Sequence, residues 1–94
     1  MIKRLYVVYD DCAQTVISGV IVEMADAPAI RAFHDALKMK DGLLAQHPTD
    51  FRLLFIGELD VEGGTIVPSR AGSFTCATGA QWVETQEKGM IINA

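Results

Sequence analysis

The segment from His47 to Val67 constrains the fold of this chain more than any other, and it reads HPTDFRLLFIGELDVEGGTIV. The proline after His47 has no backbone N–H and disfavours helical geometry at the residue before it, so any preceding helix must end here. The run from Phe51 to Leu59 has the aliphatic and aromatic content of a strand. Gly63-Gly64 tolerates the positive φ of a tight reversal into a second strand, Thr65-Ile66-Val67. The segment therefore predicts a β-hairpin.

Two further strands are expected before this segment. Residues Leu5 to Tyr9 are apolar on both faces, which is typical of a strand in the interior of a sheet or at an interface. Thr15 to Met24 is rich in β-branched residues and contains Ser18-Gly19 near its middle, where we expect a bulge. The short spacing between the two strands predicts that they pair as an antiparallel hairpin.

One helix is expected between these strands and the hairpin. Asp26 is placed to accept hydrogen bonds from the first-turn amides, and the proline two residues later suits the first turn of a helix. The period of the apolar residues predicts a face that packs on the sheet, made of Ile30, Phe33 and Leu37. Gly42 is the expected left-handed end of the helix. Leu43 to Gln46 is expected to add one short turn.

These elements predict an α+β fold, an antiparallel sheet of ββαββ order with one covering helix and a C-terminal extension. Residues 1–68 are expected to form the ββαββ domain, with no internal repeat. Residues 69–94 are expected to dock on the same core or on a partner subunit, with short strands at Phe74 to Ala77 and Gln81 to Thr85. The apolar run Met90-Ile91-Ile92 would be a liability if it stayed exposed, so we expect it to be covered as well.

Half of the 94 residues are hydrophobic, which is more apolar material than a chain of this length easily buries in its own core. A subunit interface would cover the excess, so we expect a homo-oligomer, with a dimer as the commonest symmetric form. No apolar run reaches the ~20 residues of a membrane span, and the N-terminus lacks the pattern of a signal peptide. We therefore expect no membrane partner and a reducing cytoplasm, in which Cys12 and Cys76 remain free thiols.

No catalytic or metal motif is recognisable in the sequence. His34 and His47 are expected to be structural, and together with Cys12 and Cys76 they lack the local spacing of a zinc site. The glycines do not form a nucleotide-binding loop. We expect no enzymatic activity, no metal and no cofactor.

Aromatic side chains interleaved with cations are the remaining functional signal. Single-stranded nucleic acid binds to aromatic faces that stack bases and to cations that contact phosphates. The net charge of −4 argues against a general basic field, but it is an average that allows a local basic groove. Phe51 and Phe55 are expected in the core, whereas Tyr6 and Trp82 are expected at the surface. The candidate nucleic-acid-binding residues are Lys3, Arg4, Tyr6, Arg31, Lys38, Arg52, Arg70 and Trp82.

Several short motifs occur in a recognisable order. They are Tyr9-Asp10 at the end of the first strand, Ala29-Ile30-Arg31-Ala32-Phe33 in the helix, His47-Pro48-Thr49-Asp50-Phe51 and Gly57-Glu58-Leu59-Asp60. Over residues 5–67 this pattern resembles the small non-structural protein family of gokushovirus-type microviruses. The sequence departs from that family where it has Gly19-Val20-Ile21-Val22 in place of a common Pro-Pro-Phe element, and in its apolar end.

The resemblance implies a phage protein that is absent from the virion and acts in the cytoplasm of the infected bacterial host. It implies a non-enzymatic accessory role, in which single-stranded DNA is bound during genome replication or during the switch to packaging. The alternative is a protein-interaction module that engages a phage or host replication protein without contacting DNA. The acidic net charge favours the alternative, and the family context favours DNA binding.

Overall fold

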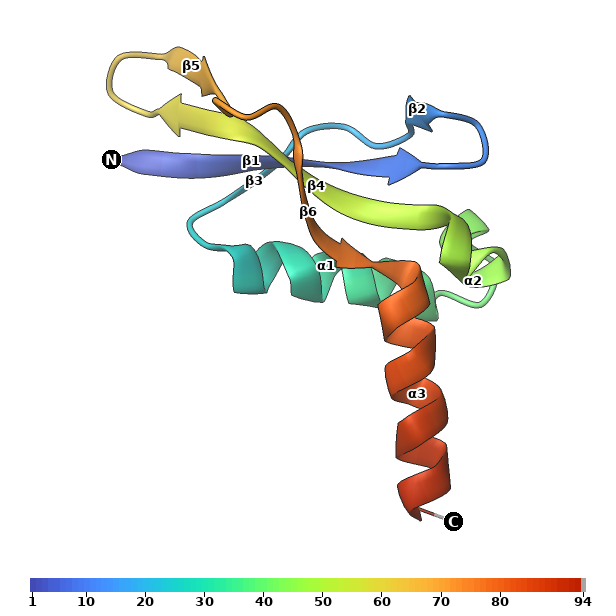
Figure 1. The fold of residues 1–94 in the computed structure, drawn as a ribbon. Helices are drawn as coiled ribbons and strands as arrows, with labels where there is room; N and C mark the ends of the chain where they lie inside the picture. Colours follow the sequence, from blue (N-terminus) through green and yellow to red (C-terminus); the bar gives the residue numbers. More distant parts are fainter. Residues whose placement is uncertain (94) are drawn as a thin grey trace.

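Two long antiparallel strands, β1 (Ile2–Asp10) and β4 (Phe51–Asp60), form the centre of the sheet (Figure 1). The structure is a computed structural model, and it describes the backbone of residues 1–93 and the side chains of residues 1–88. Two short strands lie along the outer edge of each central strand. β2 (Thr15–Val16) and β3 (Ile21–Glu23) pair antiparallel with β1. β5 (Thr65–Pro68) and β6 (Phe74–Thr78) pair antiparallel with β4.

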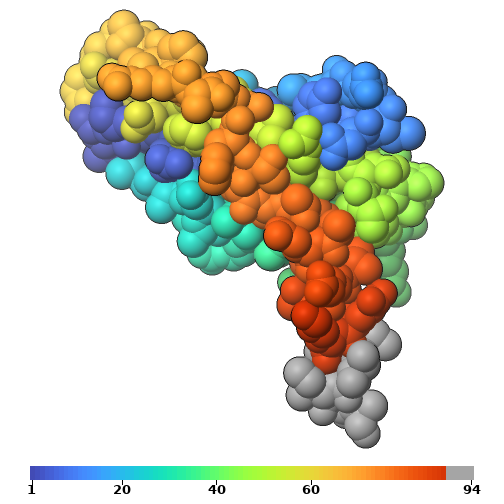
Figure 2. All heavy atoms as spheres, in the orientation of Figure 1, coloured from blue at the N-terminus to red at the C-terminus, as the bar shows by residue number. Residues whose placement is uncertain are grey.

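The helical elements lie between the two halves of the sheet and after it. They are α1 (Asp26–Lys38), the short helix α2 (Leu43–Gln46), the 3-10 turn η1 (Pro48–Asp50) and α3 (Gly79–Asn93). Figure 1 shows α1 running along one side of the sheet and α3 standing out from the body. Figure 2 shows the same outline in space-filling form, with β6 and the start of α3 between α1 and the segment that leads into β4. Within the described residues, no helix combines the length and the apolar character that crossing a bilayer requires.

The predicted α+β class, the antiparallel sheet and the β4–β5 hairpin are confirmed. The order of elements differs from ββαββ, because three strands precede α1 and three strands lie between η1 and α3. The second predicted strand is divided near Ser18-Gly19, where the amide of Val8 donates to the Ser18 hydroxyl at 2.8 Å. A side-chain oxygen thus takes the place of a strand carbonyl. Since β6 pairs with β4, part of the predicted extension belongs to the sheet.

The two halves of the sheet share one arrangement of turn, edge strands and helix, although the sequence shows no internal repeat. The carboxylates of Asp10 and Asp60 each accept hydrogen bonds from the amides two and three residues later, at 2.9 and 3.2 Å and at 3.1 and 3.2 Å respectively. Four residues after each aspartate, Gln14 and Gly64 have positive φ values of 56° and 67°. Each turn is followed by two short edge strands and then a helix. The unit β1–β3 with α1 therefore corresponds to β4–β6 with α3.

Helix α1 begins at Asp26, where its start was expected, but it ends at Lys38 and not at Gly42; it packs on the sheet by the expected face. Phe33 and Leu37 are 1% and 2% exposed, and Ile30 is half-buried at the edge of the same face. Burying side chains of this size stabilises the fold by about 1.5–3 kcal/mol each. Their partners in the core include Tyr6, Val8, Phe51 and Leu53 of the two central strands.

Two expectations about Tyr6 and Asp26 are wrong, for one reason. The Asp26 carboxylate makes no capping bond to the helix; it accepts hydrogen bonds from the Tyr6 hydroxyl and from Arg4 Nε, the latter at 2.9 Å. Tyr6 is fully buried, with its ring 5.9 Å from that of Phe55, so it presents no surface for stacking. The polar end of Tyr6 reaches the start of α1, which lets the ring enter the core with its hydroxyl satisfied.

Two further expectations about helix ends are also wrong. Gly42 has a φ of −82° and precedes α2, so it is not a left-handed end of α1. Residues 81–85 belong to α3 and not to a strand, because the Thr78 hydroxyl accepts a hydrogen bond from the Gln81 amide at 3.0 Å and caps a helix there. The side chains of the run from Met90 to Ile92 lie outside the described part of the structure, and their docking stays a prediction.

The position of α3 depends on a close contact between two backbone segments. A Cβ atom built on Gly79 would lie 1.6 Å from the carbonyl oxygen of Pro48 and 3.3 Å from that of Phe51. No side chain fits at that distance. The first turn of α3 is therefore seated directly on η1 and on the start of β4.

We predict that Gly79→Ala lowers the free energy of unfolding by more than about 3 kcal/mol, the upper end of the usual cost of overpacking. The added methyl group meets a backbone carbonyl that can move only if η1 moves with it. Urea unfolding followed by circular dichroism measures the change. Gly19→Ala is the matched control, because its Cβ has no atom within 4 Å and it is expected to stay within about 1 kcal/mol of the wild type. Equal midpoints for the two variants would contradict the prediction.

We predict that Tyr6→Phe lowers the free energy of unfolding by about 1 kcal/mol at neutral pH, the typical worth of one hydrogen bond. Burial, and then the hydrogen bond to Asp26, raise the pKa of Tyr6 from its ordinary value of 10.0 to about 12. A raised folded-state pKa contributes stability that is complete below pH 10 and is lost as the pH rises towards 12. The difference in the free energy of unfolding between wild type and variant, measured by urea unfolding, should therefore shrink over that range. A difference that stays constant would contradict the prediction. Tyr9→Phe serves as the control, since the Tyr9 hydroxyl has no hydrogen-bond partner among the described residues.

Candidate functional site

A groove of about 350 Å³ lies between α1 and α3, with β6 forming its floor. In Figure 1, α3 leaves the end of β6 beside the C-terminal half of α1 and then diverges from the body. The volume is at the lower end of the range of small-molecule sites, about 300–1,000 Å³. The lining residues are Ile30, His34, Lys38, Cys76, Ala77, Thr78, Gln81, Trp82, Thr85 and Gln86.

One wall of the groove is a single stripe of α1. Ile30, His34 and Lys38 follow one another at four-residue intervals, which places them on one face of a helix. The same face runs from apolar near the middle of α1 to cationic at its last turn. Lys38 has no ion-pair partner among the described residues, so its charge is available to a ligand.

The opposite wall is the first half of α3. Trp82 is half-buried and packs against the hydrophobic core, so its ring is held in position while it also lines the groove. Gln81 and Gln86 line the same wall, and neither side-chain amide makes a hydrogen bond within the described residues. These amides offer donors and acceptors to a ligand.

The floor of the groove is β6. Ala77 belongs to the buried core, and Cys76 packs against that core from the edge. Burial raises the pKa of the Cys76 thiol, with the nearby Asp26 carboxylate adding to the effect. The thiol is therefore a neutral, largely apolar part of the floor near neutral pH. The Thr78 hydroxyl is occupied by the α3 cap.

None of the ten lining residues is acidic, although the chain contains 12 acidic residues and 8 basic ones. The groove thus combines one aromatic ring, one free cation, one imidazole and two free amides in a surface without carboxylates. Such a surface suits a planar ring that carries a negative charge beside it. Gln81 and Gln86 are not among the residues predicted from the sequence, because the strand predicted for residues 81–85 does not place them together on one wall.

Two of the eight predicted nucleic-acid-binding residues, Lys38 and Trp82, meet in this groove. Arg31 is exposed two turns before Lys38 on the same side of α1, without an ion-pair partner in the described chain. Asp35 lies between them on the helix and moderates the local positive potential. Lys3, near the start of β1, and Arg70, in the loop between β5 and β6, do not line the groove.

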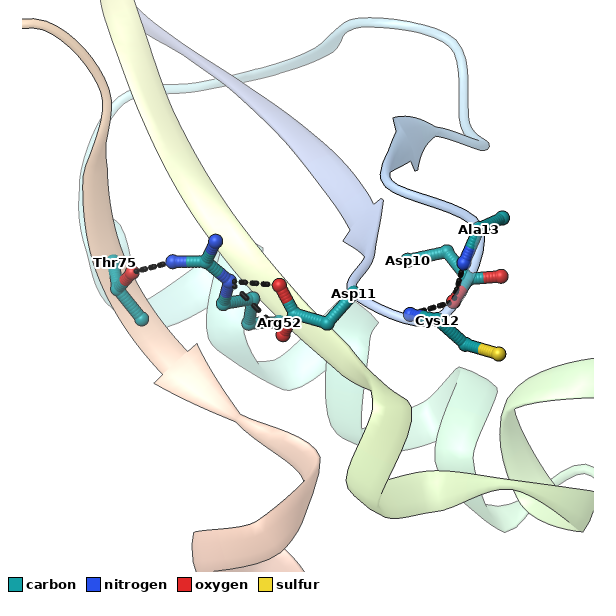
Figure 3. A network of polar contacts seen from close by, with 6 residues as sticks. All are labelled: Asp10, Asp11, Cys12, Ala13, Arg52 and Thr75. Atoms are coloured by element: carbon teal, nitrogen blue, oxygen red, sulfur yellow. Dashed lines mark hydrogen bonds and ion pairs between the residues drawn. The ribbon is translucent and has the colours of Figure 1, made fainter.

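Arg52 lies elsewhere, in a network on β4 (Figure 3). Its Nε is 2.9 and 3.1 Å from the two carboxylate oxygens of Asp11, and its Nη1 donates to the Thr75 hydroxyl at 2.9 Å. The guanidinium also lies 5.2 Å from the centre of the Tyr9 ring. Its charge is compensated and its geometry fixed, which is the arrangement of a structural clamp between the first turn, β4 and β6.

Arg4 is held in a comparable way. Its Nε donates to Asp26 at 2.9 Å and to the Tyr6 hydroxyl at 3.0 Å, and its guanidinium lies 4.1 Å from the centre of the Phe55 ring. The hydrogen bond from Tyr6 is the main cause that lowers the pKa of Asp26, and Arg4 adds to it. The three polar groups tie α1 to β1 and leave little of the Arg4 charge for an external phosphate.

The residues weighed as a zinc set do not come together as a metal site. Cys12 is exposed in the turn after β1, whereas Cys76 is half-buried in β6, and both are free thiols. Across the residues that the structure describes, no three His, Cys, Asp or Glu side chains are gathered in a way that would hold a metal ion.

Comparison with known proteins gives one family. No curated protein and no solved structure matches the chain. Residues 3–81, from the start of β1 to the first turn of α3, match the family described as phage ORF5 protein. The match covers most of the sequence and agrees with the resemblance drawn from the motifs between the first strand and the β4–β5 hairpin. The chain therefore belongs to the phage ORF5 protein family.

Proposed function

We propose that this phage protein is a non-structural, non-enzymatic accessory factor that binds single-stranded DNA through the groove between α1 and α3. It would act in the cytoplasm of the infected host during genome replication or the switch to packaging, and it would be absent from the virion. The observation that carries the proposal is the groove itself, which places Trp82 and Lys38 together without a carboxylate in a chain of net charge −4.

The chemistry of the groove matches what single strands require. A base in a single strand is unpaired, so it can leave its neighbours and stack on an aromatic ring. A cation beside that ring contacts the phosphate, and the release of counterions drives binding. Duplex DNA keeps its bases stacked inside, and a groove of about 350 Å³ is far too small to receive it. The proposal is therefore specific to single strands.

The cations suited to phosphate contact are those without a carboxylate partner. Arg31 and Lys38 meet this condition on α1, whereas Arg4 and Arg52 are paired with aspartates and Lys88 pairs with Glu84 at 3.0 Å. A strand whose base lies on Trp82 would run along the exposed side of α1. The paired arginines then stabilise the protein, and the free cations on α1 bind the strand.

We predict that Lys38→Ala weakens binding to a single-stranded oligonucleotide and lowers the salt slope by about 0.7, the value for one phosphate contact on a single strand. Arg31→Ala should have a similar effect, because both side chains lie on the same side of α1. Fluorescence anisotropy over a range of salt concentrations measures affinity and slope together.

Lys88→Ala is the matched control, since the same charge is removed from a residue that is paired on α3, outside the groove. It should leave the slope unchanged. Arg52→Ala distinguishes two possible positions of the DNA. If Arg52→Ala lowers the salt slope and Lys38→Ala does not, the DNA binds on the side of β4 that carries Arg52 and Tyr9, not in the groove. The absence of saturable binding at low salt would reject the proposed function.

A second function, association through protein contacts, is favoured by apolar side chains along both outer edges of the sheet. The edge strands are short, and several large hydrophobic residues in them and in the segment between β2 and β3 are more than a third exposed. These residues are Val16, Ile17, Val20 and Val22 on one edge, and Ile66 and Val67 on the other. Exposed strand edges pair readily with another chain. We propose a second copy as the first partner, with a phage or host replication protein as the alternative.

We predict that the protein elutes at twice the 10.2 kDa mass of one chain in size-exclusion chromatography with light scattering. A charge at the edge of the interface should shift the equilibrium towards the monomer, and Val20→Lys and Ile66→Lys test the two edges separately. Both side chains are more than half exposed, so neither substitution removes core packing. A wild-type protein that stays monomeric at high concentration would reject self-association, whatever its affinity for DNA.

A further inference from the structure

We infer that the groove between α1 and α3 is a pocket for one unstacked nucleobase, which lies against Trp82 while its phosphate meets Lys38. The inference rests on the proposed function and deepens it, since DNA could bind to the same helices by charge alone. It states that each subunit captures one base from the strand.

The volume of the groove limits how many bases of the strand it can hold. At about 350 Å³ it has the volume of a site for one ring system, not for a run of stacked bases. Its three sides are Ile30 and His34 on α1, Ala77 on β6 and Trp82 on α3, so β6 closes the floor of the space between the two helices.

Trp82 is prepared for stacking before the ligand arrives. Because its ring packs against the core, little side-chain freedom remains to be lost on binding. Stacking on an aromatic ring is tolerant of base identity, since every base has a π-face. The ring therefore gives affinity for a base without selecting which one.

The edge of the base has polar partners within the groove. The amides of Gln81 and Gln86 and the imidazole of His34 make no hydrogen bond to other described residues. By contrast, the Thr78 and Thr85 hydroxyls are bonded to the backbone of α3 around Gln81. The free amides can donate and accept, as base edges do.

The charges around the pocket favour a nucleotide over a neutral ring. Lys38 is at the last turn of α1, on the same stripe as His34, and no carboxylate lines the groove. A phosphate linked to the bound base reaches a cation there, and a planar ring without charge would leave this cation unused. The ligand class is thus a nucleotide unit within a strand.

Trp82 is the only tryptophan of the chain, so its fluorescence reports directly on the groove. The experiment uses the full-length protein and three oligonucleotides of equal length: one with all bases, one with only abasic sites, and one with a single central base among abasic sites. Anisotropy of a dye on the DNA measures affinity, and tryptophan emission measures stacking.

The expected result is saturable quenching by the full and single-base oligonucleotides and none by the abasic one. The single-base oligonucleotide should bind roughly 5- to 150-fold more tightly than the abasic one, the range for one base–aromatic stack. Trp82→Leu should remove this difference while leaving the affinity for the abasic backbone unchanged, and Trp82→Phe should keep most of it.

The outcomes distinguish the base pocket from DNA binding as such. Equal affinity for all three oligonucleotides, with no quenching, would overturn the base pocket and leave charge-driven DNA binding in place. No binding of any oligonucleotide would overturn the proposed function as well. If Trp82→Leu fails to fold, Gln86→Ala gives the second test, because this exposed helical position is tolerant and the variant should weaken the single-base oligonucleotide more than the abasic one.

Discussion

The contact between Gly79 and the carbonyl of Pro48 determines where the functional surface of this protein can form. β6 ends by pairing Thr78 with Arg52 at the start of β4, and the chain turns at once into α3. With no Cβ at Gly79, the helix begins against η1 and is directed away from the sheet. If α3 began one turn later or lay flat on the core, it would cover the stripe of α1 that carries His34 and Lys38. The groove is thus a consequence of a tight junction between backbones, and its lining residues need no special conformation.

Sequence reasoning succeeded where local patterns and core packing agree. The start and the buried face of α1 follow from Asp26 and the apolar period, and the β4–β5 hairpin follows from an apolar run and a glycine pair. It failed where a side chain makes a distant contact. The hydroxyl of Tyr6 donates a hydrogen bond to Asp26, 20 residues away. Because of this pairing, the Tyr6 ring is buried where a surface ring was expected, and Asp26 binds Tyr6 where a helix cap was expected. Residues 81–85 have a composition that suits a strand, and only the Thr78 cap and the junction at Gly79 make them helical.

The arrangement shared by the two halves is not visible as a repeat in the sequence, because the two copies share turn chemistry and not an obvious motif. An aspartate that accepts two amides, a residue with positive φ four positions later and a threonine that opens the edge strand occur in both halves. Glycine at position 64 and glutamine at position 14 meet the same backbone requirement, although glutamine does so at a steric cost. Repeats that are defined by backbone geometry are difficult to detect when one copy uses glycine and the other does not.

The difference between the two halves also explains why the groove forms beside α1. In the first half, α1 carries a continuous apolar face, with Ala29, Phe33 and Leu37 buried, and it lies flat on the sheet. In the second half, the described part of α3 has Trp82 and Val83 half-buried and is otherwise exposed after its first residue, so nothing draws it onto the same surface. Two equivalent helices would have closed the sheet completely. Because one helix buries its face and the other stands clear, the space between them remains open. Five acidic residues are held away from it, Asp10 and Asp60 in turns and Asp26, Asp11 and Glu84 in pairs with Arg4, Arg52 and Lys88.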